Sequence, residues 1–320
     1  MTSEMSSPGH MKKIRITEKN SGIRIDKFLV EEVFFNELSR GEIIREIKNG
    51  KVLVNDKEVK ASYILKENDN IEINISQKKN ELISSKDVRF KIIYQDQNII
   101  VIDKPSGLKV HPSGFEENDT LVNGLLAKFP EIKNVIDGSQ GSELRPGIVH
   151  RLDKDTSGIM VIARNRQSFD ELKKIFQERK IAKKYLTFVY GHLKNKKNTI
   201  KKPIARAENR KKQIIAHKKT RTKIREAVTE YEVIKEFNDY SLVEAMPRTG
   251  RMHQIRIHFF SLGNPVVGDQ KYKSKKTRAA KEVRRQLLHA QKLEFELFDK
   301  KYSFESELPG DFRAFLDSLD

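Results

Sequence analysis

The sequence predicts an α+β protein with a small N-terminal domain and a larger domain built on a mixed, largely antiparallel sheet flanked by helices and loops. The 320 residues, 37% of them hydrophobic, suffice for one large core and one small core. Strand-like runs outnumber helical ones and do not alternate with them as in a βαβ protein. We expect a loose tail at 1–12, a small domain at 13–76, a polar linker at 77–88 and a large domain at 89–320.

The small domain is expected to be an α+β unit. Ser39 and Glu42 form a capping-box start for a helix through GEIIREIKN, and Gly50 ends it. VLVN and EVK, joined by a polar turn, predict a short hairpin. A half-buried strand is predicted where isoleucines alternate with polar residues, at Ile71, Ile73 and Ile75.

The larger domain begins with the strand-like runs FKIIY and NIIVID. A helix is expected from Thr120 to Phe129, then a buried strand at GIMVIAR and an amphipathic helix at QSFDELKKIFQERK. Further strands are predicted at KYLTFVY, AVTEYEVIKEF, YSLVEAMP and KLEFELF.

The net charge of +18 is concentrated in two stretches. Residues 194–226 carry +12 and residues 271–285 carry +7, so the rest of the chain is nearly neutral. Basic stretches on a neutral body predict a surface for a polyanion, because each Lys or Arg that neutralises a phosphate releases counterions. A solubilising lysine-rich surface is the competing interpretation.

The sequence contains no cysteine, which excludes disulfides and thiolate metal sites. Its first ten residues lack the pattern of a signal peptide, and no apolar run approaches the length of a membrane span. We therefore expect a cytoplasmic protein.

The densest cluster of reactive side chains is VHRLDKDTSG at residues 149–158, between a Pro-Gly turn and a buried strand. It places a carboxylate beside a guanidinium on a tight loop, where a rigid scaffold presents reactive groups. Asp153 and Asp155 could equally be turn formers whose side chains bind local amides.

A second cluster is PRTGRMHQIRIHFFSLG at residues 247–263. If Gly263 ends a helix there, apolar Ile255, Phe259 and Leu262 share one face, and His253 and Arg256 share a neighbouring face. Arg256 is then partly buried and needs an anionic partner, so a structural salt bridge competes with a functional role.

The histidines do not support a metal site, although several lie near these loops, namely His111, His150, His253 and His258. His253 and His258 are five residues apart, a spacing that aims them in different directions on a helix or a strand. No HExxH motif and no Gly-rich phosphate loop is present.

The motifs together resemble the RluA family of pseudouridine synthases. VHRLDKDTSG is similar to the family signature, and its companions occur in the family's order: DKPSGLKVHPS, LVNGLLAKFP, KKYLTFVYGHL, TGRMHQIRIHFFSLGNPVVGD and RQLLHAQKLEF. Residues 23–75 resemble the S4-like RNA-binding domain found at the N-terminus of the RluC and RluD branch. The resemblance covers about nine tenths of the chain. Met252 departs from it, since the family more often has threonine there, but Met252 is not a reacting group.

This resemblance implies a role for particular residues. Asp153 matches the family's essential nucleophile, Tyr185 its active-site tyrosine, which packs on the base and could move a proton, and Arg256 the basic partner of the aspartate. Arg151 matches an arginine implicated in extruding the nucleotide. Further RNA contacts are expected from His150, Arg251, Lys211 and Lys212, and in the small domain from Arg40, Arg45, Lys48 and Lys51. The small domain is slightly acidic overall, so its RNA-binding face must be local.

The implied reaction is the isomerisation of uridine to pseudouridine, in large-subunit (23S) ribosomal RNA, on a flipped-out nucleotide. It exchanges a C–N for a C–C glycosidic bond without redox change, so we expect no cofactor and no metal, and a monomer acting on RNA. Asp153 must be ionised, and Arg256 would hold it so. Attack on the sugar, attack on the base and a glycal-type intermediate all stay open.

Two other functions compete with this one. The chain could be a non-catalytic RNA-binding or ribosome-assembly factor that keeps the fold, although intact Asp153, Tyr185 and Arg256 argue against that. It could also be a metal-dependent hydrolase using Asp153, Asp155 and His150.

Overall fold

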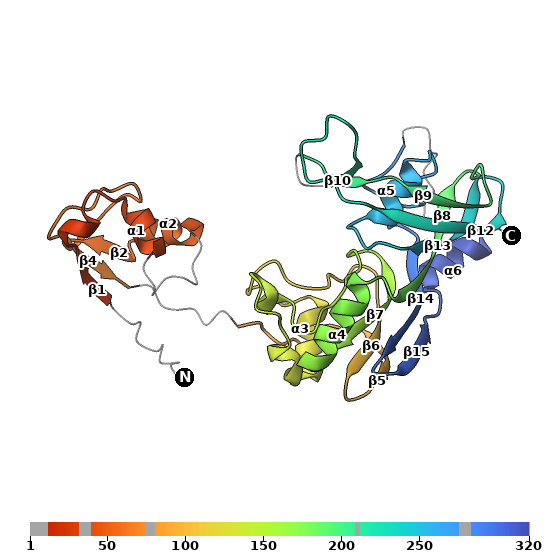
Figure 1. The fold of residues 1–320 in the computed structure, drawn as a ribbon, viewed down its shortest axis with the longest axis horizontal. Helices are drawn as coiled ribbons and strands as arrows, with labels where there is room; N and C mark the ends of the chain where they lie inside the picture. The colour runs from red at the N-terminus through yellow and green to blue at the C-terminus, as the bar shows by residue number, and fades with distance from the viewer. Residues whose placement is uncertain (1–11, 32–39, 75–80, 209–211, 275–282, 320) are drawn as a thin grey trace, which may run out of the picture. The chain divides into compact units, whose positions relative to one another are not determined.

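The computed structural model describes residues 12–31, 40–74, 81–208, 212–274 and 283–319 (Figure 1). The chain divides into two compact units, residues 1–81 and 82–320. Residues 82–88, which the sequence assigns to a linker, belong to the second unit. The Asn123 side-chain amide donates to the carbonyl oxygen of Ile83 at 2.6 Å, which attaches this segment to the larger core. The expected tail lies outside the described residues except for Lys12, which opens the first strand.

In its described residues, the small unit contains a four-stranded sheet in the order β1-β4-β2-β3 and the helices α1 and α2. Its elements are β1 (Lys12–Arg15), α1 (Ile25–Glu31), α2 (Arg40–Lys48), β2 (Val52–Val54), β3 (Lys57–Glu58) and β4 (Asn70–Ile73), with a 3-10 turn at Glu18–Asn20. The predicted helix, hairpin and strand are confirmed as α2, β2–β3 and β4. Ser39, the expected cap, and Ile75, the last isoleucine of the predicted strand, lie outside the described residues. Ile25, Ile43 and Ile71 are fully buried between the helices and the sheet.

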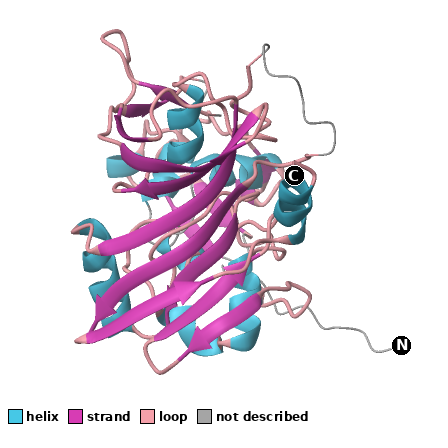
Figure 2. Cartoon of the chain, turned by 90° about the vertical axis from the view of Figure 1, so that its right-hand side faces the viewer, coloured by secondary structure: helices cyan, strands magenta, loops and turns pink. Residues whose placement is uncertain are grey.

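The larger unit contains a nine-stranded sheet in the order β5-β6-β7-β14-β8-β13-β12-β9, with β15 paired to β14 (Figure 2). Its strands are β5 (Lys91–Gln95), β6 (Ile99–Lys104), β7 (Ser157–Ala163), β8 (Ile181–Tyr190), β9 (Lys197–Lys201), β12 (Val228–Glu236), β13 (Tyr240–Pro247), β14 (Leu288–Leu297) and β15 (Lys300–Glu305). Among the strands that the structure describes, only β7 and β14 pair in parallel, so the predicted α+β class with a largely antiparallel sheet is confirmed.

The helices of this unit are α3 (Leu121–Lys128), α4 (Arg166–Gln177), α5 (Gln254–Phe260) and α6 (Gly310–Asp317), with short 3-10 turns at Pro130–Asn134 and Ser142–Leu144. A separate hairpin is formed by β10 (Ile204–Arg206) and β11 (Gln213–Ile215). The sequence predicted α3, α4 and α5 but neither α6 nor the β10–β11 hairpin. α5 ends at Phe260, so Leu262 lies beyond the helix and is 38% exposed, contrary to its expected place on the apolar face.

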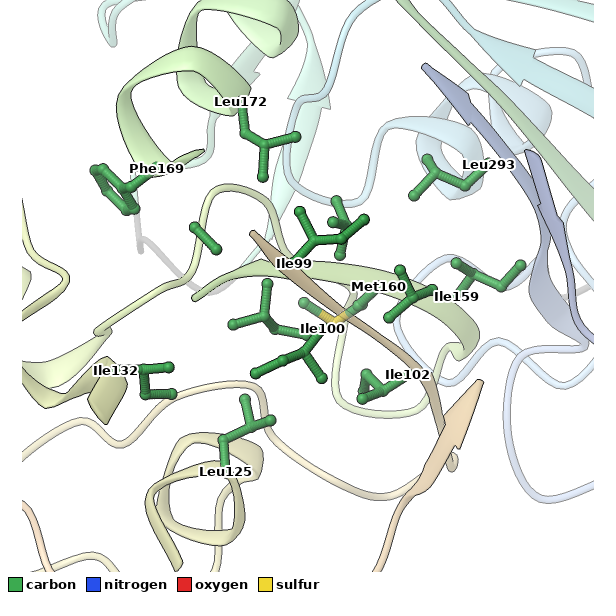
Figure 3. Packing of buried hydrophobic residues seen from close by; sticks show 14 of the residues in the cluster. Ile99, Ile100, Ile102, Leu125, Ile132, Ile159, Met160, Phe169, Leu172 and Leu293 are labelled. Carbon is green, nitrogen blue, oxygen red and sulfur yellow. The ribbon is translucent and has the colours of Figure 1, made fainter. Parts of the chain in front are cut away.

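The main core lies around β6 and β7. Every residue of β7 is buried, which explains why GIMVIA is an uninterrupted apolar run rather than an alternating one. Figure 3 shows Leu125 of α3 and Leu172 of α4 among side chains of the two strands such as Ile100 and Met160. The sheet thereby fixes the start of β7, immediately after the VHRLDKDTSG loop.

Gly158 permits the parallel pairing at that point. It has a φ of +116°, and a Cβ there would lie 2.2 Å from the carbonyl oxygen of Ala290 on β14. Gly158→Ala is expected to lower the free energy of unfolding by about 3 kcal/mol or more, because the close backbone of β14 cannot yield. Chemical denaturation of the full chain would measure this.

Gly263→Ala is the matched control, since Gly263 also has a positive φ of +88° but has no atom within 4 Å of the added Cβ. Its cost should be only about 1 kcal/mol. Equal losses in the two variants would show that the approach of β14 is not the cause.

Candidate active site

A cleft of about 1490 Å³ opens in the larger unit. Its walls come from the loop before β7, from β8, from the region of the β10–β11 hairpin and from residues 247–256. Both clusters singled out in the sequence, VHRLDKDTSG and PRTGRMHQIR, therefore line one cavity. Its volume exceeds the roughly 300–1,000 Å³ of a typical small-molecule site.

Asp153 lines this cleft and lies on a loop that is held from two sides. The buried Lys104 ammonium donates to the carbonyl oxygens of Pro105, Leu108 and Lys154 at 2.8–2.9 Å. Arg285 Nη1 donates to the carbonyl oxygen of Asp155 at 3.1 Å. These bonds fix the backbone on the C-terminal side of Asp153, while its own carboxylate stays 21% exposed to the cleft.

The Asp153 carboxylate does not cap a local turn. Its Oδ2 accepts a hydrogen bond from Arg256 Nη1 at 2.7 Å, across 103 residues of sequence. The turn is closed instead by the backbone, where Thr156 N–H donates to the carbonyl oxygen of Asp153. Asp155 is not among the residues that line the cleft.

Arg256, on α5, joins two carboxylates. Its Nε and Nη2 donate to the two oxygens of Asp269 at 2.6 and 2.9 Å, while Nη1 faces Asp153. Burial alone would lower the pKa of Arg256, but the bonds to Asp269 and the charges of both carboxylates outweigh it and raise the pKa. The side chain is more deeply buried than expected, at 4% exposure, because Asp269 satisfies its inner edge.

Tyr185 lies on β8 and lines the same cleft. Burial raises the pKa of the Tyr185 phenol, and the negative charge of Asp153 raises it further. The phenol therefore keeps its proton over the physiological range. Its ring also packs against the main core, which holds it in place.

His253 is the second group near Asp153, with its Nε2 3.9 Å from Asp153 Oδ2. The backbone N–H of Gln213 donates to the Tyr272 hydroxyl at 2.7 Å, and that hydroxyl lies 2.9 Å from His253 Nδ1. The hydroxyl can donate to Nδ1, and in that tautomer the imidazole proton lies on Nε2, facing Asp153. Burial lowers the pKa of His253, which favours this neutral tautomer.

Sequence reasoning missed Asp269 and Tyr272. Asp269 accepts the backbone N–H groups of Lys271 and Tyr272 in addition to Arg256. The Tyr272 ring lies 5.4 Å from the Arg256 guanidinium carbon. Asp269 is the last residue of the TGRMHQIRIHFFSLGNPVVGD motif. The sequence could have indicated Asp269 through the predicted need of Arg256 for an anionic partner.

The expected RNA-contact residues of the larger unit differ in their exposure and in their hydrogen bonds. Arg151 is exposed at the cleft, Arg251 Nε donates to the carbonyl oxygen of Glu226, and Lys212 is exposed. His150 accepts the backbone N–H of Val161 and stacks on Phe176 with ring centroids 4.6 Å apart. Burial lowers the pKa of His150 to about 3, so it is a neutral wall residue. Lys211 lies outside the described residues.

In the small unit, the four expected RNA-contact residues belong to α2 or the turn after it and are all exposed. Arg40 Nη2 donates to the buried carboxylate of Asp26 at 2.8 Å, and Arg24 Nε binds the same group. Arg45 lies 3.9 Å from Glu46 and stays 64% exposed. Lys48 and Lys51 complete this basic edge.

The histidines do not meet around an ion. His258 contacts the Thr229 hydroxyl and the carbonyl oxygen of Lys202, and His111 contacts the carbonyl oxygen of Pro112. Across the described part of the chain, no group of three or more His, Asp or Glu side chains is arranged to hold a metal. No helix within the described ranges is both long and apolar enough to cross a membrane.

Comparison with known proteins gives concordant matches. The family described as RNA pseudouridylate synthase matches residues 98–261, and the S4 domain matches residues 23–71. An uncharacterized RNA pseudouridine synthase of Bacillus subtilis is 33% identical over 97% of this chain and 99% of its own length. The ribosomal large subunit pseudouridine synthase D of Borreliella burgdorferi is 32% identical over 96% of this chain and 93% of its own length. The structure of human RNA pseudouridylate synthase domain containing 1 has a TM-score of 0.58 and 26% identity, covering 72% of this chain and 86% of that one.

Proposed function

The chain belongs to the RNA pseudouridylate synthase family, and we propose that it converts uridines of large-subunit ribosomal RNA to pseudouridine with Asp153 as nucleophile. The family and the RluA-type arrangement with an S4 domain make it an RNA-modifying isomerase. Several relatives are named ribosomal large subunit pseudouridine synthase D, and this supports ribosomal RNA as the substrate.

The observation that carries the proposed mechanism is the 2.7 Å contact between Asp153 and Arg256 inside a cleft larger than one nucleotide. The net reaction breaks the bond from C1′ to N1 and forms one from C1′ to C5. The hydrogen of C5 is released to solvent as a proton, and N1 takes up a proton in exchange. Unstacking the uridine costs a few kcal/mol, which the basic surface can offset through phosphate contacts. Arg256 stabilises the negative charge of the Asp153 carboxylate.

Tyr185 and His253 are the neutral groups that face the same space. The protonated phenol of Tyr185 can pack on the uracil ring and donate or relay a proton during the rearrangement. In the tautomer that carries its proton on Nε2, His253 points that proton toward Asp153 and helps to orient the carboxylate. Neither role requires a metal or a cofactor.

The test of this function is the release of tritium from [5-³H]uridine-labelled 23S RNA, together with pseudouridine mapping in cells with and without the protein. We expect release that survives a chelator, and the loss of specific pseudouridines when the gene is absent. Tight RNA binding without release would instead identify a non-catalytic RNA-binding factor. Activity abolished by chelation would favour a metal-dependent hydrolase.

A further prediction concerns the basic stretch at residues 194–226. Replacing the exposed Lys218, Lys219 and Lys223 by Gln should weaken RNA binding and reduce the slope of log K against log salt by about two. Fluorescence anisotropy across a salt series would measure this.

The matched control replaces three exposed lysines that do not line the cleft, Lys86, Lys91 and Lys301. It makes the same change in net charge and should leave the slope unchanged. Identical slopes in the two triple variants would show that the basic stretch only confers solubility.

A further inference from the structure

Strand β8 presents a second functional side chain to the cleft. Ile181, Lys183 and Tyr185 all line it, whereas the residues between them do not. This is the period of two expected of a strand with one face on the cavity. Lys183 therefore lies on the same wall as Tyr185, about 7 Å away along the strand.

Lys183 has no acidic partner among the described residues. Burial alone lowers the pKa of Lys183 to about 8, with no carboxylate raising it again. Its neighbours are the neutral His150, whose pKa the Lys183 charge helps to lower, and Gly250, where an added Cβ would lie 4.0 Å from Lys183 Nζ. An ammonium held in a partly buried wall beside uncharged groups is favourable only if an anion enters the cleft.

Several other cations of the cleft are paired with carboxylates. Arg179 is paired with Glu226, Arg248 with Glu230, and Arg256 with Asp153 and Asp269. The adjacent Lys184 points to the opposite face of β8 and binds Glu244 at 3.0 Å. Of these two consecutive lysines, Lys184 is paired outside the cleft and Lys183 is unpaired inside it. This contrast indicates that Lys183 binds a ligand.

We propose that Lys183 binds a backbone phosphate of the RNA strand, next to the nucleotide held at Asp153 and Tyr185. This rests on the proposed function and specifies what the cleft recognises. An RNA strand brings one anionic phosphate with every nucleotide, and a lysine ammonium binds phosphate as a point charge. Lys183 thereby fixes the register of the strand, so that one base reaches Tyr185.

The first test uses the wild-type full-length protein and measures the acetylation rate of each lysine by mass spectrometry. The probes are pentauridylate and free uridine. Pentauridylate should slow acetylation of Lys183 at least fivefold, uridine should leave it unchanged, and Lys184 should react at the same rate throughout. Equal protection by uridine would mean that Lys183 contacts the base, and no protection by pentauridylate up to millimolar concentration would equally overturn the proposal.

The second test compares Lys183→Met, Lys183→Arg and the matched control Lys184→Met in binding to a 15-residue oligouridylate across a salt series. Lys183→Met should reduce the salt slope by about 0.7, the value for one phosphate contact on a single strand. Lys183→Arg should restore the slope, and Lys184→Met should not change it. Equal slopes in the two Met variants would refute the phosphate contact.

Both tests read binding rather than turnover. If the protein passes both tests but releases no tritium from 23S RNA, the proposed reaction is refuted and the phosphate site is supported. If the protein releases tritium but RNA does not protect Lys183, the proposed reaction is supported and the phosphate site is refuted.

Discussion

Asp153→Asn is expected to reduce tritium release by at least about 10³-fold while leaving RNA affinity within a factor of about three. The amide keeps the size and the position of the carboxylate, and Arg256 stays held by Asp269. What is lost is the negative charge that we propose attacks the nucleotide. Single-turnover assays with saturating enzyme would separate this loss from any change in binding.

Asp155→Asn is the matched control for that variant. It makes the same chemical change two residues away, at a side chain that does not line the cleft, and its backbone carbonyl still accepts Arg285. We expect its rate to stay close to that of the wild type. If Asp153→Asn retained full activity, the proposed nucleophile would be wrong.

Arg256→Lys is expected to lower the single-turnover rate by about 10²-fold and also to lower the melting temperature. A lysine ammonium is a point charge and cannot bind both oxygens of Asp269 while reaching Asp153. Asp269 is 4% exposed, so it would lose a bidentate partner within the protein, and Asp153 would lose its fixed orientation.

Asp269→Asn provides the comparison that isolates positioning from charge. Here the guanidinium stays beside Asp153 but its inner anchor is weakened, so we expect a smaller loss of rate, of about tenfold. A rate for Asp269→Asn below that of Arg256→Lys would show that Asp269 acts in some other way than through Arg256.

The sequence was sufficient for the fold class and for the strands and helices with clear periodicity, such as β7 and α4. The sequence also predicted that Asp153 and Arg256 belong to one site, although 103 residues separate them. This prediction was possible because the two residues lie in two motifs of the same family. Their contact in the structure agrees with that expectation, and the roles themselves stay predictions.

The features that the sequence did not give depend on long-range packing. Arg256 can be buried because Asp269 binds its guanidinium. The periodicity of the sequence does not predict that Asp269 lies close to the helix that contains Arg256. The exposure of Leu262 follows from α5 ending at Phe260, two residues earlier than the apolar pattern implied. The β10–β11 hairpin lies inside a lysine-rich stretch where apolar and polar residues alternate only weakly. The pattern of the sequence therefore did not predict its two strands.

The parallel pairing of β7 with β14 sets a condition on synthesis of the enzyme. The loop that contains Asp153 emerges near the middle of the chain. Strand β14, next to that loop, and Arg285, which binds its backbone, come from the last eighth of the chain. The middle of the sheet therefore cannot close until translation is nearly finished. A nascent or prematurely terminated chain contains Asp153 without the strand and the arginine that hold its loop, so we expect an unfinished copy to be inactive.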